Sequence, residues 1–305
     1  MVENVTKKVT QKYYRFLNVP AGDLRISITD MCNMHCSYCH NEGQEKAIKN
    51  MTFEDFVYIV ENSIKYGVRK VRLTGGEPLM HPDIERIAQY LKINNNINNC
   101  GLNTNGYNRE LLIKMCEQRL FDQVVIGLDY FSAPVSKDSP IGPSSEEVLK
   151  TVEYLKHIGV NVQITKVYNY DIEEIYNLIE WCFQRKVLLK ILEKTDEKNM
   201  DSKDYFDNII DIIINKYNLK LGLTVDLNEY YAYNDAGNKI LFFQSHCNRR
   251  ECETCKNMHL RVMSTGYTKS CLLRDDTSFN LLENFDDAMK KAIVNLGIPP
   301  EKEKK

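Results

Sequence analysis

Alternating apolar and polar positions follow a polar lead-in at residues 1–22. Leu24, Ile26 and Ile28 alternate with polar neighbours, which predicts a strand with one buried face. Further short apolar runs alternate with stretches that have helical spacing, capping signals and glycine stops. The predicted strands span residues 24–28, 70–73, 100–103, 123–128, 160–167 and 187–192, and the predicted helices span 52–66, 82–92, 109–118, 146–157, 171–184 and 204–217.

Six strand–helix repeats predict a parallel sheet with crossover helices. Parallel crossovers are right-handed, so six such units can curl into a partial barrel. We therefore expect an α/β fold with a partial (β/α)6 barrel at residues 23–218. The cysteine-rich and glycine-rich loops follow strands, so they should lie at the carboxyl edge of the sheet, where α/β barrels build their sites.

The pattern changes at about residue 219. Short β segments are predicted, with Gly266 at a hairpin turn, followed by a helix. These segments span residues 224–233, 239–243, 260–263 and 267–273, and the helix spans 286–295. We expect a small β-hairpin-plus-helix domain at residues 219–298 and a charged tail at 299–305.

The charge balance, with 40 basic and 42 acidic residues, argues against a dedicated nucleic-acid binder. No apolar run is long enough for a membrane span, and the N-terminus lacks the apolar region of a signal peptide. We therefore expect a cytoplasmic protein with reduced thiols, in which clustered cysteines bind metal. Cys100, Cys116 and Cys182 are isolated and are expected to be small buried hydrophobic residues.

The first cysteine cluster, Cys32, Cys36 and Cys39, has C-x3-C-x2-C spacing on one predicted loop. Three thiolates on a tight loop suit zinc or a [4Fe–4S] cluster. Zinc in a structural site needs a fourth ligand, which His35 or His40 could supply. A cubane cluster held by three cysteines keeps one iron open for a substrate, which is a catalytic arrangement.

The segment around this cluster resembles the radical S-adenosylmethionine (SAM) signature, and the match covers about residues 23–195. The matching segments are Arg25–Cys39, Leu73–Leu79, Asn103–Gly106 and Gly127–Asp129. The resemblance implies that the three cysteines hold a [4Fe–4S] cluster whose open iron binds the amino-acid end of SAM. It also implies reductive cleavage of SAM to a 5′-deoxyadenosyl radical, which abstracts a hydrogen from the substrate.

The resemblance further implies a set of SAM-binding residues. Two glycines lack side chains, so their backbone can approach the methionine part of SAM. An aromatic residue lies between two cluster ligands, where the family places one beside the adenine. Asn105 and Asp129, at strand ends, could contact a ribose hydroxyl or an ammonium group. Structural roles stay open for both residues and for Glu77. The set is Tyr38, Gly75, Gly76, Glu77, Asn105 and Asp129.

The second cysteine cluster resembles the auxiliary-cluster domain of radical SAM enzymes, in the short "twitch" form of the SPASM architecture. The resemblance implies that Cys252, Cys255 and Cys271 bind an auxiliary [4Fe–4S] cluster, with Cys247 as a possible fourth ligand. Structural zinc is the alternative. Four ligands would favour electron transfer by this cluster, and three would favour direct binding of the substrate.

The family that matches most closely is GTP 3′,8-cyclase of molybdenum cofactor biosynthesis. The chain shares its Leu-Arg-Ile-Ser run, the Leu73–Leu79 segment, the pattern from Leu260 to Leu272, and Glu193 after a strand. It departs from the family in a longer spacing between auxiliary cysteines and in a reduced set of arginines at Asn257–Val262. It also ends in a charged tail instead of Gly-Gly. Because of these departures, we keep GTP as the alternative substrate and not as the main one.

The main expectation is a radical SAM enzyme that modifies a small molecule or a peptide and is reduced by a donor such as flavodoxin or ferredoxin. About 22 residues precede the barrel, too few for a peptide-binding domain. A different class, a non-catalytic iron–sulfur or zinc sensor or scaffold, would not need the Gly75–Pro78 segment. No catalytic side chain is assigned.

Overall fold

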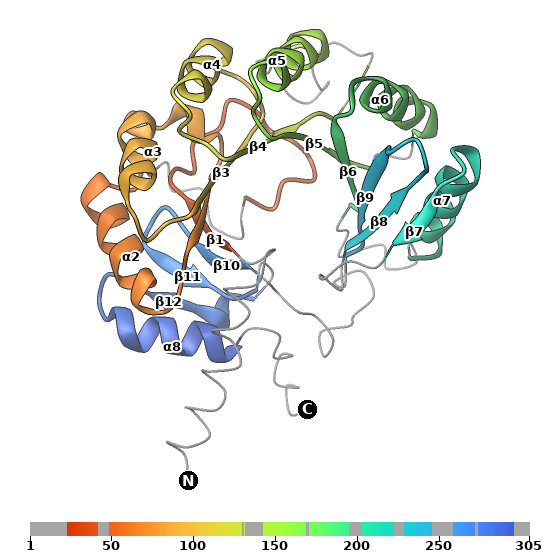
Figure 1. Cartoon of the computed structure of the whole chain (residues 1–305). Helices are drawn as coiled ribbons and strands as arrows, with labels where there is room; N and C mark the ends of the chain where they lie inside the picture. The colour runs from red at the N-terminus through yellow and green to blue at the C-terminus, as the bar shows by residue number, and fades with distance from the viewer. Residues whose placement is uncertain are drawn as a thin grey trace, which may run out of the picture.

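A single mixed sheet, curved into an open barrel, organises the chain (Figure 1). The computed structural model describes residues 23–41, 49–129, 131, 143–168, 171–194, 203–222, 229–245, 259–271 and 274–295. The strands are β1 (Asp23–Ser27), β2 (Lys70–Thr74), β3 (Asn99–Thr104), β4 (Gln123–Gly127), β5 (Val162–Val167), β6 (Leu188–Leu192), β7 (Lys220–Gly222), β8 (Glu229–Tyr233), β9 (Lys239–Phe243), β10 (His259–Val262), β11 (Tyr267–Lys269) and β12 (Ser278–Asn280). The helices are α2 (Phe53–Lys65), α3 (Ile84–Ile93), α4 (Arg109–Glu117), α5 (Ser145–His157), α6 (Ile172–Arg185), α7 (Lys203–Lys216) and α8 (Phe285–Asn295).

Strands β1 to β6 are parallel and adjacent in chain order, which confirms the α/β partial barrel expected from the sequence. Several details differ from the expectation. The helix expected from residue 82 begins at Ile84, after a 3-10 turn at Pro78–Met80. Strands β7 and β12 were not predicted, because three residues are too short for a periodic signal. The β segment expected at residues 267–273 ends at Lys269.

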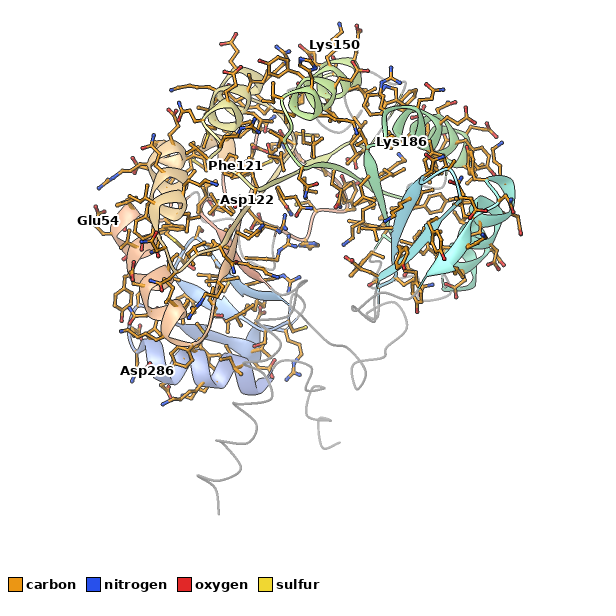
Figure 2. The ribbon with its side chains drawn as sticks, in the orientation of Figure 1. Glu54, Phe121, Asp122, Lys150, Lys186 and Asp286 are labelled. Atoms are coloured by element: carbon orange, nitrogen blue, oxygen red, sulfur yellow. The ribbon has the colours of Figure 1, made fainter. Side chains whose placement is uncertain are left out.

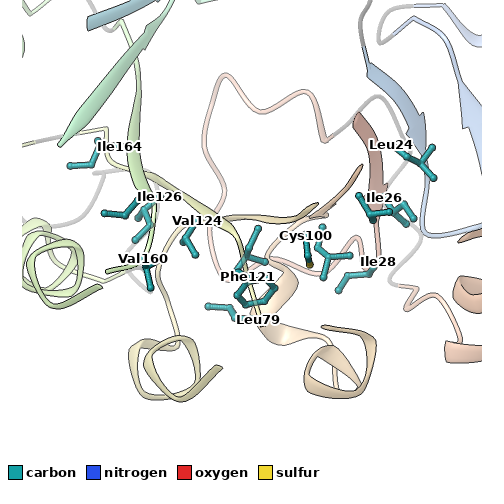
Figure 3. Close-up of a cluster of buried hydrophobic side chains, with 14 of the residues drawn as sticks. Leu24, Ile26, Ile28, Leu79, Cys100, Phe121, Val124, Ile126, Val160 and Ile164 are labelled. Carbon is teal, nitrogen blue, oxygen red and sulfur yellow. The ribbon is translucent and has the colours of Figure 1, made fainter. Parts of the chain in front are cut away.

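The apolar layer lies between the sheet and the outer helices, as the buried side chains of Figure 3 show. Leu24 and Ile26 on β1 are fully buried there, while the alternate residue Arg25 is only partly buried. Helix α2 adds Phe56 and Ile59 to the same layer. Because successive strand side chains point to opposite faces, the intervening polar residues face the concave side of the sheet.

Buried cysteines occur in this apolar layer and in its helices. Cys100, Cys116 and Cys182 are at most 2% exposed, which confirms that they are small buried residues.

None of the helices in the described residues combines the length and apolar character that crossing a membrane would require.

The C-terminal part of the chain extends the barrel sheet at both edges. Strand β9 pairs in parallel with β6, and β8 and β7 continue that edge. Strand β10 pairs in parallel with β1, and β11 returns antiparallel through a turn at Gly266 (φ +84°). Helix α8 packs against β11 and β12 beside α2, where the Tyr66 hydroxyl donates to Asp286 Oδ1 at 2.5 Å (Figure 1).

Side chains at the amino ends of the parallel strands make structural contacts. Asp122 precedes β4, and its Oδ2 accepts from the Cys100 backbone N–H at 2.7 Å. Lys186, at the end of α6, donates to Ala236 O at 2.9 Å and to Asn238 Oδ1 at 2.8 Å, which ties the helix to the β8–β9 turn (Figure 2). The carboxyl edge of the parallel strands therefore stays available for a site.

Candidate functional site

Four loops that follow parallel strands meet at the carboxyl edge. The loop after β1 carries Cys32, Cys36 and Cys39, and the loop after β2 carries the Gly-Gly-Glu segment. Asn105 follows β3, and Asp129 follows β4. Since parallel strands all end at one edge, segments up to about a hundred residues apart in the chain come together here.

The cysteine loop turns so that backbone N–H groups point at its sulfurs. The Met34 N–H donates to Cys32 Sγ at 3.4 Å, and the Asn41 N–H donates to Cys39 Sγ at 3.3 Å. Burial raises the pKa of the Cys36 thiol to about 11. A thiolate at Cys36 is therefore stabilised only when a cation binds it.

The donor set fits a [4Fe–4S] cluster better than a single ion. Among the described residues, no three His, Cys, Asp or Glu side chains converge as they would around one metal ion. His35 and His40, the fourth ligands considered for zinc, are exposed. In a cubane each thiolate binds a different iron, so the three sulfurs need not converge on one point. Three thiols on an accessible loop would satisfy that requirement and would leave one iron for another ligand.

The Gly-Gly-Glu segment lies directly on the backbone of the cysteine loop. The Gly76 N–H donates to Thr29 O at 2.8 Å, and the Glu77 N–H donates to Met31 O at 2.7 Å. A Cβ at Gly76 would lie 2.2 Å from Met31 O, and one at Gly75 would lie 2.4 Å from Thr29 O. Both positions therefore require glycine, because the two backbones touch.

Glu77 binds the protein through both carboxylate oxygens. Its Oε1 accepts from Thr104 Oγ1 at 2.6 Å and from the Leu79 N–H at 3.0 Å, and its Oε2 accepts from the Asn105 N–H at 2.7 Å. The residue is 1% exposed. Burial raises the pKa of Glu77 to about 7, although these hydrogen bonds lower it. Of the two roles left open by the sequence, the geometry favours the structural one, a bridge between the ends of β2 and β3.

Asn105 joins the end of β3 to the cysteine loop. Its Nδ2 donates to Asn33 Oδ1 at 2.9 Å and lies 4.0 Å from Cys32 Sγ. Its Oδ1 accepts from the Tyr107 N–H at 2.8 Å. The side chain is thus oriented at the cluster loop before any ligand binds.

Tyr38 and Asp129 connect the cysteine loop to the end of β4. The Tyr38 hydroxyl donates to Asp129 Oδ2, and burial raises the pKa of both groups. Lys166, which the sequence interpretation missed, donates from Nζ to the backbone oxygen of Asp129. The available signal was a lysine at a strand position where the alternation of Val162 and Ile164 calls for an apolar residue.

Thr74, the last residue of β2, is a second residue that the sequence interpretation missed. It is 2% exposed, and its Oγ1 has no hydrogen-bond partner among the described residues. Buried hydroxyls are rarely left unsatisfied. Its place directly before Gly75 suits a contact with a polar ligand group at this edge.

A row of cations crosses the concave face of four neighbouring strands. The strand register sets Arg25 beside both Arg72 and Arg261, and it sets Arg261 opposite Lys269. These residues come from β11, β10, β1 and β2, which are consecutive in the sheet; β1, β10 and β11 are labelled in Figure 1. We refer to the four residues as the cation row. No local sequence pattern showed that they would be aligned.

Arg72 is held in this row by neutral partners. Its guanidinium donates to Asn103 Oδ1 at 3.2 Å and to Gln123 Oε1 at 2.7 Å. A Cβ at Gly101 on the neighbouring strand would lie 2.9 Å from the guanidinium carbon, so that glycine makes room for it. Amide oxygens orient the group and leave its positive charge in place.

The second cysteine cluster is described only at Cys271. This residue follows β11, is partly buried, and its N–H bonds Thr277 Oγ1 at 3.3 Å. Cys247, Cys252 and Cys255 lie outside the described residues. The auxiliary cluster therefore stays a prediction.

The fold and the site together define a class of enzyme. An open α/β barrel carries three loop cysteines beside a Gly-Gly-Glu segment, and the family model described as "Radical SAM superfamily" matches residues 26–182. The chain belongs to the radical SAM superfamily. Membership implies SAM and a [4Fe–4S] cluster as its cofactors.

Two archaeal relatives are similar to this chain over most of its length. The chain is 31% identical over 267 residues to a probable GTP 3′,8-cyclase of Methanocaldococcus jannaschii, covering 85% of this chain and 87% of the relative. It is 28% identical over 278 residues to a probable GTP 3′,8-cyclase of Methanococcus maripaludis, covering 87% and 91%.

Solved structures share the fold. Streptococcus suis SuiB bound to S-adenosylmethionine matches with a TM-score of 0.62 at 16% identity, over 86% of this chain and 63% of that chain. A structure described as native anSMEcpe with bound AdoMet matches with a TM-score of 0.60 at 15% identity, over 88% and 79%.

Gly76→Ala tests the contact between the two loops. We expect it to lower the free energy of unfolding of the cluster-free protein by about 1–3 kcal/mol, because a methyl group must push against Met31 O. Denaturant unfolding measures the change. Gly127→Ala is the matched control, since its Cβ would meet only Thr104 O, at 3.9 Å. Equal losses in the two variants would contradict the close-contact explanation.

Glu77→Gln tests the buried carboxylate through pH. Because the pKa of Glu77 is raised to about 7 in the folded state, folding favours its protonated form. The stability of the native protein relative to Glu77→Gln should therefore fall as pH rises from about 4.5 to 7, by at most about 3 kcal/mol. Unfolding of both cluster-free proteins across this range measures the difference. A difference that is constant or grows with pH would show that the carboxylate is buried in its charged form.

Proposed function

We propose that the chain is a radical SAM enzyme that acts on a nucleoside triphosphate, with GTP as the substrate and 3′,8-cyclisation as the reaction. In this proposal Cys32, Cys36 and Cys39 bind the [4Fe–4S] cluster. When bound, the reduced cluster and SAM together supply the 5′-deoxyadenosyl radical that abstracts a substrate hydrogen. An external electron donor such as flavodoxin or ferredoxin reduces the cluster.

The chain's own groups support a SAM site at the carboxyl edge. Gly75 and Gly76 place this segment directly against the cysteine loop, and the Thr74 hydroxyl is ready to bond a polar group of SAM there. Tyr38 and Asp129, joined by a hydrogen bond, close the side toward β4. Glu77 and Asn105 hold these loops at their separation.

The cation row is the observation that carries the substrate assignment. Arg25, Arg72 and Arg261 come from adjacent strands at one level of the concave face. Guanidinium groups bind phosphate oxygens in bidentate fashion, and several arginines at one level suit a polyphosphate. A peptide or an uncharged small molecule gives no reason for such an array.

The relatives support the same substrate. Both relatives named above are probable GTP 3′,8-cyclases and cover most of this chain. This favours the substrate that the sequence interpretation held as its alternative. Peptide modification rests on a weaker comparison, because the SuiB structure bound to precursor peptide SuiA is 17% identical and shares the fold alone.

An auxiliary [4Fe–4S] cluster is part of the proposal. Cys271 lies two residues beyond Lys269, at the end of β11 and thus beside the cation row. Cys252 and Cys255 would complete the three ligands, and Cys247 would be the fourth where the cluster is closed. Because β11 runs antiparallel to β10, such a cluster would lie toward the amino ends of the parallel strands, on the side of the cation row away from the cysteine loop.

Cys36→Ala tests the radical chemistry. Reconstituted native protein, reduced anaerobically, should convert SAM to 5′-deoxyadenosine in the presence of GTP, and Cys36→Ala should produce essentially none because one cluster ligand is lost. Chromatography measures the product. GTP deuterated in its ribose should transfer deuterium into 5′-deoxyadenosine, which mass spectrometry detects.

Cys116→Ala, which removes a buried thiol on α4, is the matched control and should retain product formation. Native protein without 5′-deoxyadenosine would sink the radical SAM proposal. Product without deuterium transfer would reject GTP as the hydrogen donor and keep the chemistry.

Removal of one arginine from the cation row tests phosphate binding. Native protein should bind GTP more tightly than GDP, and GDP more tightly than GMP. Arg25→Ala or Arg261→Ala should raise the Kd for GTP about tenfold or more and compress this series, because a charged hydrogen bond to phosphate is lost. Isothermal titration measures each Kd.

Lys150→Ala, an exposed lysine paired with Glu146 on the outer helix α5 (Figure 2), should leave every Kd unchanged. Native protein that binds GTP and GMP equally would contradict the role of the row.

A further inference from the structure

Lys166 is the one charged residue of the described part whose exposure is 0%. It lies near the end of β5, on the face that Val162 and Ile164 present to the apolar layer. Fully buried lysines are rare, because burial disfavours the charged amine. Burial accordingly lowers the pKa of Lys166, while the nearby Asp129, Glu174 and Asp171 raise it.

The amine holds one end of the segment that follows β4. Lys166 Nζ donates to the backbone oxygen of Asp129, and Glu174 Oε2 accepts from the Phe131 N–H at 2.5 Å. Glu174 lies in the first turn of α6, whose N-terminus is capped by Asp171. Asp129 and Phe131 are therefore each held by a side chain, the first from β5 and the second from α6.

These contacts begin where the sheet stops holding the chain. A last backbone bond joins the Leu128 N–H to Thr165 O at 2.9 Å. Asp129 lies beyond it, so its carbonyl depends on Lys166. The backbone is therefore held on both sides of the Asp129 Cα: the Leu128 N–H is bonded before it, and the Asp129 carbonyl is bonded after it. Asp129 consequently has little backbone freedom. Its carboxylate is thereby directed to the Tyr38 hydroxyl.

Packing alone does not explain a lysine at this position. A methionine would fill a similar volume without desolvating an amine. Methionine could not donate to the Asp129 carbonyl, as the Lys166 amine does. That contact lies one hydrogen bond away from Tyr38, which stands between the ligands Cys36 and Cys39.

We propose that Lys166 is a positioning residue for the SAM site, acting through Asp129 on Tyr38 and so on the cluster loop. This inference rests on the proposed function. Lys166 touches neither the cluster nor SAM in this proposal. Its effect is to fix the loop from β4 before the cofactors bind.

Lys166→Met tests the positioning role in the reconstituted protein. Added SAM should change the electron paramagnetic resonance spectrum of the reduced cluster. In Lys166→Met, we expect the SAM concentration at half of this change to rise about tenfold or more, as for other substitutions that act through a neighbouring residue. Iron content per chain should stay at the native value. Ile164→Val, on the same face of β5, is the control for packing and should keep the native SAM dependence.

A double variant tests the route through Tyr38. Tyr38→Phe removes the hydroxyl that binds Asp129, so Lys166→Met should add little to the SAM dependence of Tyr38→Phe. Full additivity of the two changes would overturn the route. Native SAM dependence in Lys166→Met would also overturn the inference and leave a purely structural lysine.

Cluster-free protein supplies an independent readout. Amide hydrogen exchange at Leu128, Asp129 and Phe131 should be faster in Lys166→Met than in Ile164→Val. Glu174→Ala, which frees the other end of the segment from a partly exposed position, should raise exchange in the same segment even if Lys166→Met does not fold. Unchanged exchange in both variants would reject the inference. Native protein whose spectrum ignores SAM would instead reject the proposed function, whatever the exchange shows.

Discussion

The site depends on one contact between two backbones, that of the Gly-Gly-Glu segment with the cysteine loop. Two N–H groups, those of Gly76 and Glu77, bond the carbonyls of Thr29 and Met31, and a methyl group at either glycine would separate them. This contact sets the distance between the thiols and the segment expected to bind SAM. Glu77 accepts hydrogen bonds from Thr104 and Asn105 and so joins this segment to the end of β3. Asn105 in turn donates to Asn33 of the cysteine loop. The three loops after β1, β2 and β3 are thus each hydrogen-bonded to the other two.

The periodic part of the fold was predictable from the sequence. Alternation in segments such as Leu24–Ile28 marks each parallel strand, and the loop motifs mark the edge where the chemistry belongs. What escaped prediction depends on contacts between distant segments. The cation row needs the register of β10, β1 and β2, and Arg25 and Arg72 are neighbours only once these strands pair. Likewise, Glu77 could be assigned a structural role only when both of its oxygens were seen to be engaged.

The concave face is electrostatically one-sided. On the β1 side, Arg72 of the cation row donates to two amide oxygens and keeps its charge, while Lys269 pairs with the exposed Asp275 at the end of the row. On the opposite side, Lys190 of β6 forms an ion pair with Glu229 of β8 and lies 5.1 Å from the ring centre of Phe243. The charge of Lys190 is thereby neutralised within the protein. An anionic group that enters the barrel is therefore attracted to one wall, which orients an asymmetric substrate before specific contacts form.

Both the cation row and the apolar layer follow from the same strand register. Along β1, Arg25 faces the concave side while Leu24 and Ile26 enter the layer under the helices. A slip of one residue would bury Arg25 and expose its apolar neighbours, which the packing of α2 and α8 does not permit. The large apolar layer therefore specifies where the charged residues stand, although it touches no ligand. Buried polar groups such as Glu77 and Lys166 oppose folding individually, and the register held by that layer is what allows the carboxyl edge to keep them.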